Sequence, residues 1–243
     1  MIDNHAHVGW FTDGYHSPRE VWQVEQDAGI DEFAVSSTST CAELYKLVVK
    51  EMRVIIRLGG SRIHPILWLT PRMLKTWGLS YMLHSKIRWQ GVKLHWEVHK
   101  EWFYNHKLLY NALEVAKKLQ VPVLLHTGNS KECHANVFLD VCKQYDTLDF
   151  ILAHGRPIDE TKNVLKECNN VYVDTAFMST TNIKELVDDG YSRRILYGTD
   201  APINLLFYKE MSTVDYLKNN MKELQDVLSP KEFETIITNK LYS

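Results

Sequence analysis

The chain opens with Ile2-Asp3-Asn4-His5-Ala6-His7-Val8, a short strand-like run with two histidines one residue apart. Side chains alternate between the two faces of a strand, so His5 and His7 point the same way and can hold one ion as a pair. Asp3 lies one step deeper on that face, where its carboxylate is expected to orient the imidazoles. These residues predict a strand that ends in metal-ligating side chains.

Similar apolar runs recur along the chain, and helix-like stretches lie between them. Alternation of this kind predicts a parallel sheet. Helices are expected from the Ser-Pro pair at 17–18 and over 40–52, about 72–85 and 105–119. Eight such units favour a closed (β/α)8 TIM barrel of the α/β class over a doubly wound open sheet, with 1–243 as a single domain. The eight predicted strands cover 2–8, 32–36, 64–69, 91–95, 121–126, 150–154, 171–174 and 195–200.

Composition and charge restrict the functional classes. A formal net charge of −2 offers no attraction to nucleic acid or to an anionic membrane. The four cysteines are scattered, as expected for reduced thiols in a cytoplasmic protein. No apolar run approaches the roughly 20 residues of a membrane span. We expect the mature chain to start as shown, because removal of a leader would remove His5 and His7.

Polar residues end four of the predicted strands. These endings are the pair His5 and His7, then His126, His154 and Asp200. Active sites of (β/α)8 barrels lie at the C-terminal ends of the strands, where ligands from distant strands can converge. A lone histidine at a strand end is usually a hydrogen-bonded structural residue, but the joint pattern predicts a metal site.

Five stretches of the chain carry a family resemblance: Ile2-Asp3-Asn4-His5-Ala6-His7, Gly91-Val92-Lys93-Leu94-His95, Val123-Leu124-Leu125-His126-Thr127-Gly128, Leu152-Ala153-His154-Gly155 and Ile195-Leu196-Tyr197-Gly198-Thr199-Asp200-Ala201-Pro202. In these stretches the chain resembles the amidohydrolase superfamily, and more closely its amidohydrolase-related branch of metal-dependent TIM-barrel hydrolases. The resemblance implies that His5, His7 and His126 ligate the metal, and that Asp200 contacts both the metal and the attacking water. In single-metal members the counterpart of His154 faces the substrate or the water.

Lys93 and His95 share one face of the fourth strand, with Lys93 deeper if that face is the interior. Two interpretations of Lys93 stay open: carboxylation to bridge two metals, or an ammonium paired with an acid such as Asp3, which we favour. His95 is expected to line the substrate pocket or to touch metal. We expect one divalent metal, zinc by default for nitrogen-rich ligands, with Mn²⁺, Fe²⁺ or Ni²⁺ as alternatives.

In the expected mechanism Asp200 is the general base and His154 stabilises charge on the substrate oxygen. Arg156 could bind a substrate carboxylate, and Trp10, Trp96 and other strand-end aromatics could line the pocket. Each of these side chains also has an ordinary structural interpretation, because such arginines are usually solvated and such aromatics usually pack under loops.

Three functions remain open at this point. The first is hydrolysis of a small-molecule ester, lactone or amide, which the resemblance favours. The second is non-oxidative decarboxylation of a small aromatic or conjugated acid. The third is a metal-binding barrel without turnover. Short loops favour a small-molecule substrate, and the sequence is also compatible with a homo-oligomer.

Overall fold

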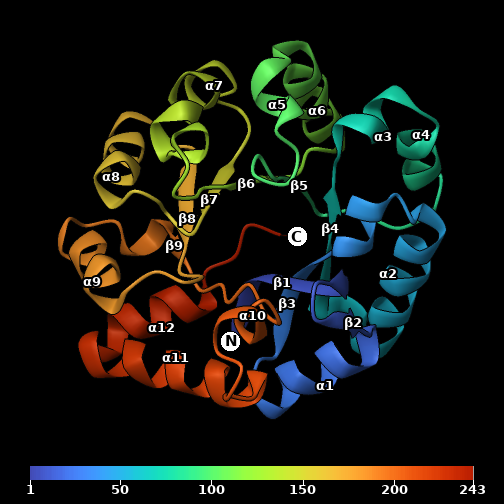
Figure 1. The fold of residues 1–243 in the computed structure, drawn as a ribbon. Helices are drawn as coiled ribbons and strands as arrows, with labels where there is room; N and C mark the ends of the chain where they lie inside the picture. Colours follow the sequence, from blue (N-terminus) through green and yellow to red (C-terminus); the bar gives the residue numbers. More distant parts are fainter. Residues whose placement is uncertain (243) are drawn as a thin grey trace.

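The computed structural model describes residues 1–242, which form an α/β fold around one curled sheet. The sheet has nine strands in the order β2-β1-β3-β4-β5-β6-β7-β8-β9, and its strands are parallel except for the antiparallel pair β1 and β2. The helices surround the sheet on its outer side (Figure 1). The strands are β1 (Ile2–Phe11), β2 (Gly14–His16), β3 (Glu32–Ser37), β4 (Ile63–Trp68), β5 (Gly91–Leu94), β6 (Val123–His126), β7 (Phe150–Ala153), β8 (Val171–Asp174) and β9 (Ile195–Leu196).

The first helix shows how local sequence sets these boundaries. Ser17 caps α1 in a reciprocal capping box with Glu20, and Pro18 occupies the first helical position, as the Ser-Pro pair predicts. The helices are α1 (Pro18–Asp27), α2 (Tyr45–Gly59), α3 (Pro71–Lys75), α4 (Gly78–Leu83), α5 (Glu101–Tyr104), α6 (His106–Leu119), α7 (Leu139–Gln144), α8 (Ile158–Glu167), α9 (Thr180–Asp188), α10 (Asn204–Phe207), α11 (Thr213–Val227) and α12 (Pro230–Thr238).

All eight predicted strands overlap observed ones, and three details differ. The last strand, β9, stops at Leu196, and the residues after it continue as irregular backbone. The helix expected over about 72–85 is broken into α3 and α4, because Thr76 takes an extended conformation. The hairpin strand β2 is not predicted, although Asp13-Gly14 is a recognised hairpin turn signal.

Backbone hydrogen bonds bring the segment after β9 next to β1. Asn4 N donates to Tyr197 O at 2.8 Å, and His7 N donates to Ala201 O at 2.7 Å. Residues 197–201 therefore lie beside β1 and its two histidines.

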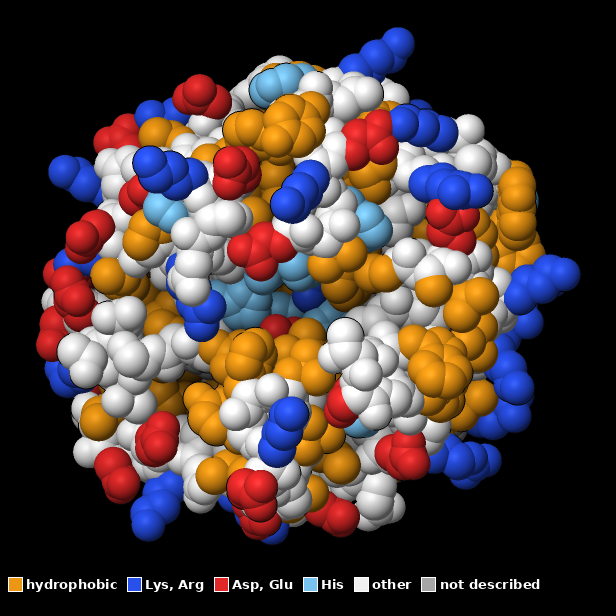
Figure 2. All heavy atoms as spheres, in the orientation of Figure 1, with side chains coloured by type: hydrophobic (Ala, Val, Ile, Leu, Met, Phe, Trp, Pro, Cys, Tyr) orange, Lys and Arg blue, Asp and Glu red, His pale blue; other side chains and the backbone are white. Residues whose placement is uncertain are grey.

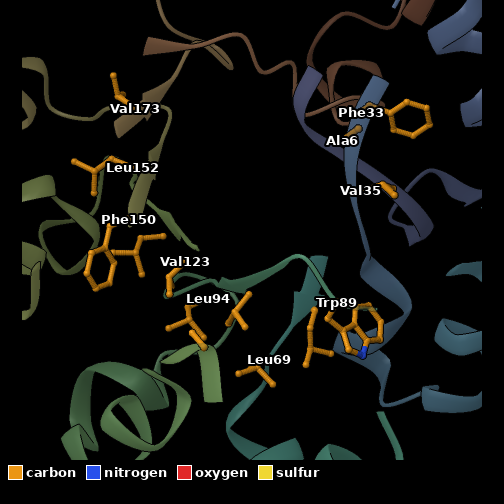
Figure 3. Packing of buried hydrophobic residues seen from close by; sticks show 14 of the residues in the cluster. Ala6, Phe33, Val35, Leu69, Trp89, Leu94, Val123, Phe150, Leu152 and Val173 are labelled. Carbon is orange, nitrogen blue, oxygen red and sulfur yellow. The ribbon is translucent and has the colours of Figure 1, made fainter. Parts of the chain in front are cut away.

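The strands bury alternate residues on opposite faces. Phe33, Val35, Phe150 and Leu152 belong to the large core cluster, and Figure 3 shows Phe33 and Phe150 projecting away from the centre of the sheet. A smaller inner cluster takes the intervening positions, such as Ala34, Ile151 and Ala153. This period of two fixes which face each polar strand residue occupies.

The inner face is closed at its base by the C-terminal residues. Tyr242 packs in the inner cluster, and its hydroxyl lies 3.3 Å from Asn4 O. Figure 1 shows the red segment after α12 running toward the centre of the ring of strands. None of the helices in the described range 1–242 combines the length and the apolar character needed to cross a membrane.

Candidate metal centre and active site

Ala6 and Val8, which alternate with the two histidines along β1, pack in the large core cluster outside the sheet. His5 and His7 therefore lie on the inner face of β1. The two Nε2 atoms are 3.2 Å apart. Asp200 places Oδ1 3.2 Å from His5 Nε2 and 2.8 Å from His7 Nε2. Two ligands of a tetrahedral ion with bonds of about 2.0–2.1 Å lie roughly 3.3 Å apart. The spacing of these three atoms therefore fits a single cation.

Asp200 is held in place by a backbone hydrogen bond as well as by the contacts of its carboxylate. Its N–H donates to His5 O at 2.6 Å, and its φ of 58° turns the chain sharply at this point. Oδ1 is buried without a hydrogen bond of suitable geometry. Burial alone would raise the pKa of Asp200, but His5, His7 and Lys93 together hold it well below its ordinary value. An ionised, unsatisfied carboxylate oxygen is suited to a cation.

The two imidazoles are neutral at physiological pH. Burial, followed by the charge of Lys93, lowers the pKa of both His5 and His7 to about 3. The Nδ1 of His5 is 2.8 Å from Asp174 Oδ2, and that of His7 is 2.8 Å from Ser36 Oγ. With Nδ1 occupied on each ring, Nε2 remains for a metal, which binds the neutral form of histidine.

Lys93 points into the centre of this group. Its Nζ lies 2.7 Å from His5 Nε2 and 2.9 Å from His7 Nε2, and burial lowers its pKa to about 8. The expected partner Asp3 instead accepts hydrogen bonds from Thr199 and from the backbone N–H of His5. Lys93 is also too deeply buried to line the cavity, so its expected role in substrate binding is not supported.

His126 lies at the rim, further from the centre. Its ring stacks on His95 with centroids 3.7 Å apart, and its Nε2 lies 3.2 Å from Glu97 Oε2. Because Glu97 accepts the Nε2 proton, the lone pair of the neutral ring is on Nδ1, which is buried without a partner. The orphaned Nδ1 makes His126 suitable as a further ligand, although it is outside the compact group of His5, His7 and Asp200.

His154 follows β7 with a φ of 71°. Its Nδ1 is 3.0 Å from the carbonyl oxygen of Ala176, and its Nε2 is 3.7 Å from Asp200 Oδ2. Since a carbonyl can only accept, Nδ1 carries the proton and Nε2 is an acceptor. Burial lowers the pKa of His154 to about 3, so the ring stays neutral. The expected role of stabilising negative charge on the substrate oxygen does not suit this form.

A cavity of about 530 Å³ opens above these residues. Figure 2 shows histidine side chains gathered in the hollow at the centre of this face. Arg156 lines the cavity, as expected, and its guanidinium donates to Phe177 O at 2.9 Å. The lining residues are His95, Glu97, His126, Gly128, Asn129, His154, Arg156, Phe177, Asp200, Ile203, Phe207 and Tyr208.

The structure does not bring Trp10 or Trp96 to this cavity. Trp10 lies on the β1–β2 hairpin against Tyr15, and 52% of its surface is exposed. Trp96 is buried against Phe138, with ring centroids 4.7 Å apart. Both therefore differ from the expected pocket residues, because each packs into its own local environment.

The sequence interpretation missed two acids that touch the histidines. Asp174 ends β8 and contacts His5, while Glu97 follows β5 and contacts His126. Asp174 could have been predicted from the sequence, because Val171-Tyr172-Val173-Asp174 is another apolar strand that ends in a possible ligand. Glu97 lies in a loop, and its sequence context gave no comparable signal.

Comparisons with known proteins give a family and a fold. The family model described as amidohydrolase matches residues 86–236. A comparison with curated proteins gives no match. A probable 2-pyrone-4,6-dicarboxylic acid hydrolase from Acinetobacter baumannii is 14% identical, with a TM-score of 0.65 and coverage of 97% of this chain and 95% of that one.

Two further solved structures have the same general fold. A 4-oxalomesaconate hydratase from Rhodopseudomonas palustris is 13% identical, with a TM-score of 0.64 and coverage of 98% and 93%. A 5-carboxyvanillate decarboxylase from Novosphingobium aromaticivorans, complexed with manganese, is 10% identical, with a TM-score of 0.60 and coverage of 90% and 77%. At these identities the likeness extends to the fold alone. Because the family model covers more than half of the chain, this protein belongs to the amidohydrolase family.

Proposed function

We propose that this protein is a metal-dependent hydrolase that acts on a small-molecule ester, lactone or amide. The observation that carries the proposal is the convergence of His5 Nε2, His7 Nε2 and Asp200 Oδ1 at spacings that fit one cation, next to an open cavity that Asp200 lines. Membership of the amidohydrolase family supports it, and the proteins of similar fold include a probable hydrolase and a decarboxylase complexed with manganese.

We also propose that the eight parallel strands close into a (β/α)8 barrel, and that the chain is a single domain. The hydrogen bonds from Asn4 to Tyr197 and from His7 to Ala201 support closure between the first and last strands. Closure matters for the site, because it brings ligands from opposite ends of the chain to one rim.

The resident cation is proposed to be one zinc ion, held by His5, His7 and Asp200, with His126 completing the set through its unpartnered Nδ1. A divalent cation supplies Lewis acidity, polarising a substrate carbonyl and making a water molecule acidic near neutral pH. Lys93 Nζ contacts the Nε2 atoms of both histidines, which are the atoms proposed to bind the cation. Lys93 must therefore move away or lose its proton when the cation binds. Manganese, iron and nickel are the alternatives for these ligands.

Asp200 and His154 are the proposed catalytic residues. Asp200 Oδ2 and His154 Nε2 lie 3.7 Å apart, so one water molecule beside both atoms could donate a hydrogen bond to His154 and a proton to Asp200. Asp200, ionised in the protein, takes that proton and delivers it to the leaving group. His154 is neutral with Nε2 unprotonated, and it orients the water as an acceptor.

Decarboxylation of a small aromatic acid is the second candidate. Arg156 could pair with a carboxylate at the cavity, and Phe177, Phe207 and Tyr208 supply aromatic lining beside it. A metal-binding barrel without turnover is the third candidate, but the open cavity above Asp200 speaks against it.

Parallel assays separate these candidates. Zinc-loaded and manganese-loaded protein is tested on a panel of lactones, esters and amides, and on aromatic acids with detection of released carbon dioxide. We expect hydrolysis, with turnover abolished by Asp200→Asn and by His154→Ala. The matched control is Asp226→Asn, because Asp226 is exposed on α11. Full activity in the Asp200 variant, or no turnover of either panel by loaded wild-type protein, would contradict the proposal.

A further inference from the structure

Asp174, at the end of β8, is fully buried, and both of its carboxylate oxygens are engaged. Oδ2 lies 2.8 Å from His5 Nδ1. Oδ1 accepts the backbone N–H of His154 at 2.9 Å and that of Ala176 at 3.1 Å. One carboxylate therefore contacts a proposed metal ligand and the backbone of a proposed catalytic residue.

We propose that Asp174 is a positioning residue that fixes the tautomer and orientation of His5, and that Gly198 is required for the two side chains to meet. The consequence for metal binding rests on the proposed function. The tautomer of His5 is a property of the metal-free protein, so that part of the proposal is independent of the proposed function.

The hydrogen-bond pattern leaves one arrangement of protons. Oδ1 of Asp174 faces two backbone N–H donors, so it must act as an acceptor. Lys93 Nζ lies 2.7 Å from His5 Nε2 and can donate a hydrogen bond to it, so the ring proton of His5 is on Nδ1, which donates a hydrogen bond to Oδ2. The neutral His5 ring therefore keeps its lone pair on Nε2, directed at Asp200 Oδ1 and Lys93 Nζ.

Gly198 provides the space for this contact. A Cβ at position 198 would lie 3.0 Å from Asp174 Cβ and 3.1 Å from His5 Cβ. Both atoms are attached directly to the backbone, so neither can swing aside as the end of a long side chain could. An added Cβ would therefore require Asp174 and His5 to shift by a few tenths of an ångström, which would disturb the contact between them.

Asp174 could also form a ligand group with His5 and His154. We assign it instead as a positioning residue, because Oδ2 contacts His5 Nδ1 and Oδ1 accepts two backbone hydrogen bonds. Asp3, the acid that the sequence favours for this role, makes its contacts to backbone N–H groups and to the Thr199 hydroxyl. The strand-end acid of β8 thus performs the task expected of the acid on β1.

The sharpest test is Asp174→Asn in the full-length chain. The two backbone donors require the amide oxygen at the Oδ1 position, which turns the NH₂ group toward His5 Nδ1. The amide then donates to Nδ1, and the His5 proton moves to Nε2. Long-range ¹H–¹⁵N correlation spectra of histidine-labelled, metal-free protein report the tautomer, with His5 assigned by its loss in His5→Gln.

We expect the Nδ1–H form of His5 in the wild-type protein and in Asp226→Asn, and the Nε2–H form in Asp174→Asn. A proton on Nε2 in the wild-type protein, or an unchanged tautomer in the folded variant, would overturn the proposal. Gly198→Ala supplies a second variant if Asp174→Asn does not fold, and we expect it to lose the fixed Nδ1–H form.

Zinc affinity, measured by competition with a chromogenic chelator, gives the consequence. Loss of an oriented outer partner typically lowers metal affinity about 10–100-fold, and we expect a loss in this range for Asp174→Asn and Gly198→Ala. If wild-type protein binds no metal, the proposed function fails while the tautomer result still decides the role of Asp174. If the wild-type protein and both variants bind zinc equally, the role of Asp174 is refuted and the metal site stands.

Discussion

Gly155 follows His154 directly, and its replacement by alanine tests how tightly the backbone is packed beneath the catalytic rim. Its φ is +53°, a left-handed conformation that costs an L-residue about 1–2 kcal/mol. An added Cβ would lie 2.5 Å from Met178 Cε and 2.6 Å from Val173 Cγ2. The methionine terminus can move, but Val173 is fully buried on β8, so overpacking adds about 1–3 kcal/mol.

The expected loss in free energy of unfolding for Gly155→Ala is therefore about 2–5 kcal/mol. Gly190→Ala is the matched control, since Gly190 has a φ of +87° and no atom within 4 Å of an added Cβ. It should lose only the backbone contribution of about 1–2 kcal/mol. Urea denaturation followed by circular dichroism measures both variants. If both variants lost the same free energy of unfolding, the predicted overpacking around Gly155 would be wrong.

Three further predictions concern polar side chains: the buried Glu25, the half-buried Asn239 and the exposed Glu97. Burial, with the charge of Asp3 as a smaller cause, raises the pKa of Glu25 well above 4.5, and neither of its oxygens has a hydrogen-bond partner. Its contribution to stability is thus complete below pH 4.5 and is lost as the pH rises from 4.5 through the folded-state pKa, so Glu25→Gln should make the free energy of unfolding less dependent on pH within that interval. Asn239→Ala removes two side-chain hydrogen bonds to backbone carbonyls and should cost about 1–3 kcal/mol in urea denaturation. Glu97→Ala removes the acceptor that holds His126, and should weaken zinc binding about 10–100-fold in a chelator competition.

Each of these predictions has a contrary outcome. An unchanged pH profile for Glu25→Gln would mean that Glu25 is ionised in the folded protein. A loss in free energy of unfolding below about 0.5 kcal/mol for Asn239→Ala would show that water replaces the two side-chain hydrogen bonds of Asn239 at little cost. Unchanged zinc affinity in Glu97→Ala would remove Glu97 from the support of the metal site.

The positions of the strands and of the strand-end ligands could be predicted from the sequence, because both follow from local periodicity. Alternation along β1 places His5 and His7 on one face, and the same rule turns Lys93 inward from β5. Strand-end location also predicts His154 and Asp200 at the same rim. These inferences need only short-range patterns and the common direction of parallel strands.

The partners of these side chains could not be predicted, because they depend on long-range register and on rotamers. Asp3 and Asp174 both end up buried near His5, but only Asp174 reaches its ring, through the space beside Gly198. Trp96 is close in sequence to the rim, yet its rotamer places it in a separate aromatic cluster. Contacts of this kind are decided by three-dimensional packing.

The central claim is that His5, His7 and Asp200 gather around one divalent cation. Anomalous diffraction at the zinc edge, on crystals of the zinc-loaded protein, tests it most directly. The account predicts one strong peak about 2.0–2.2 Å from His5 Nε2, His7 Nε2 and a carboxylate oxygen of Asp200, with Lys93 Nζ displaced from its present contacts. A map without a peak between these residues, or with the zinc bound only elsewhere, would contradict the proposed metal centre and the hydrolytic function built on it.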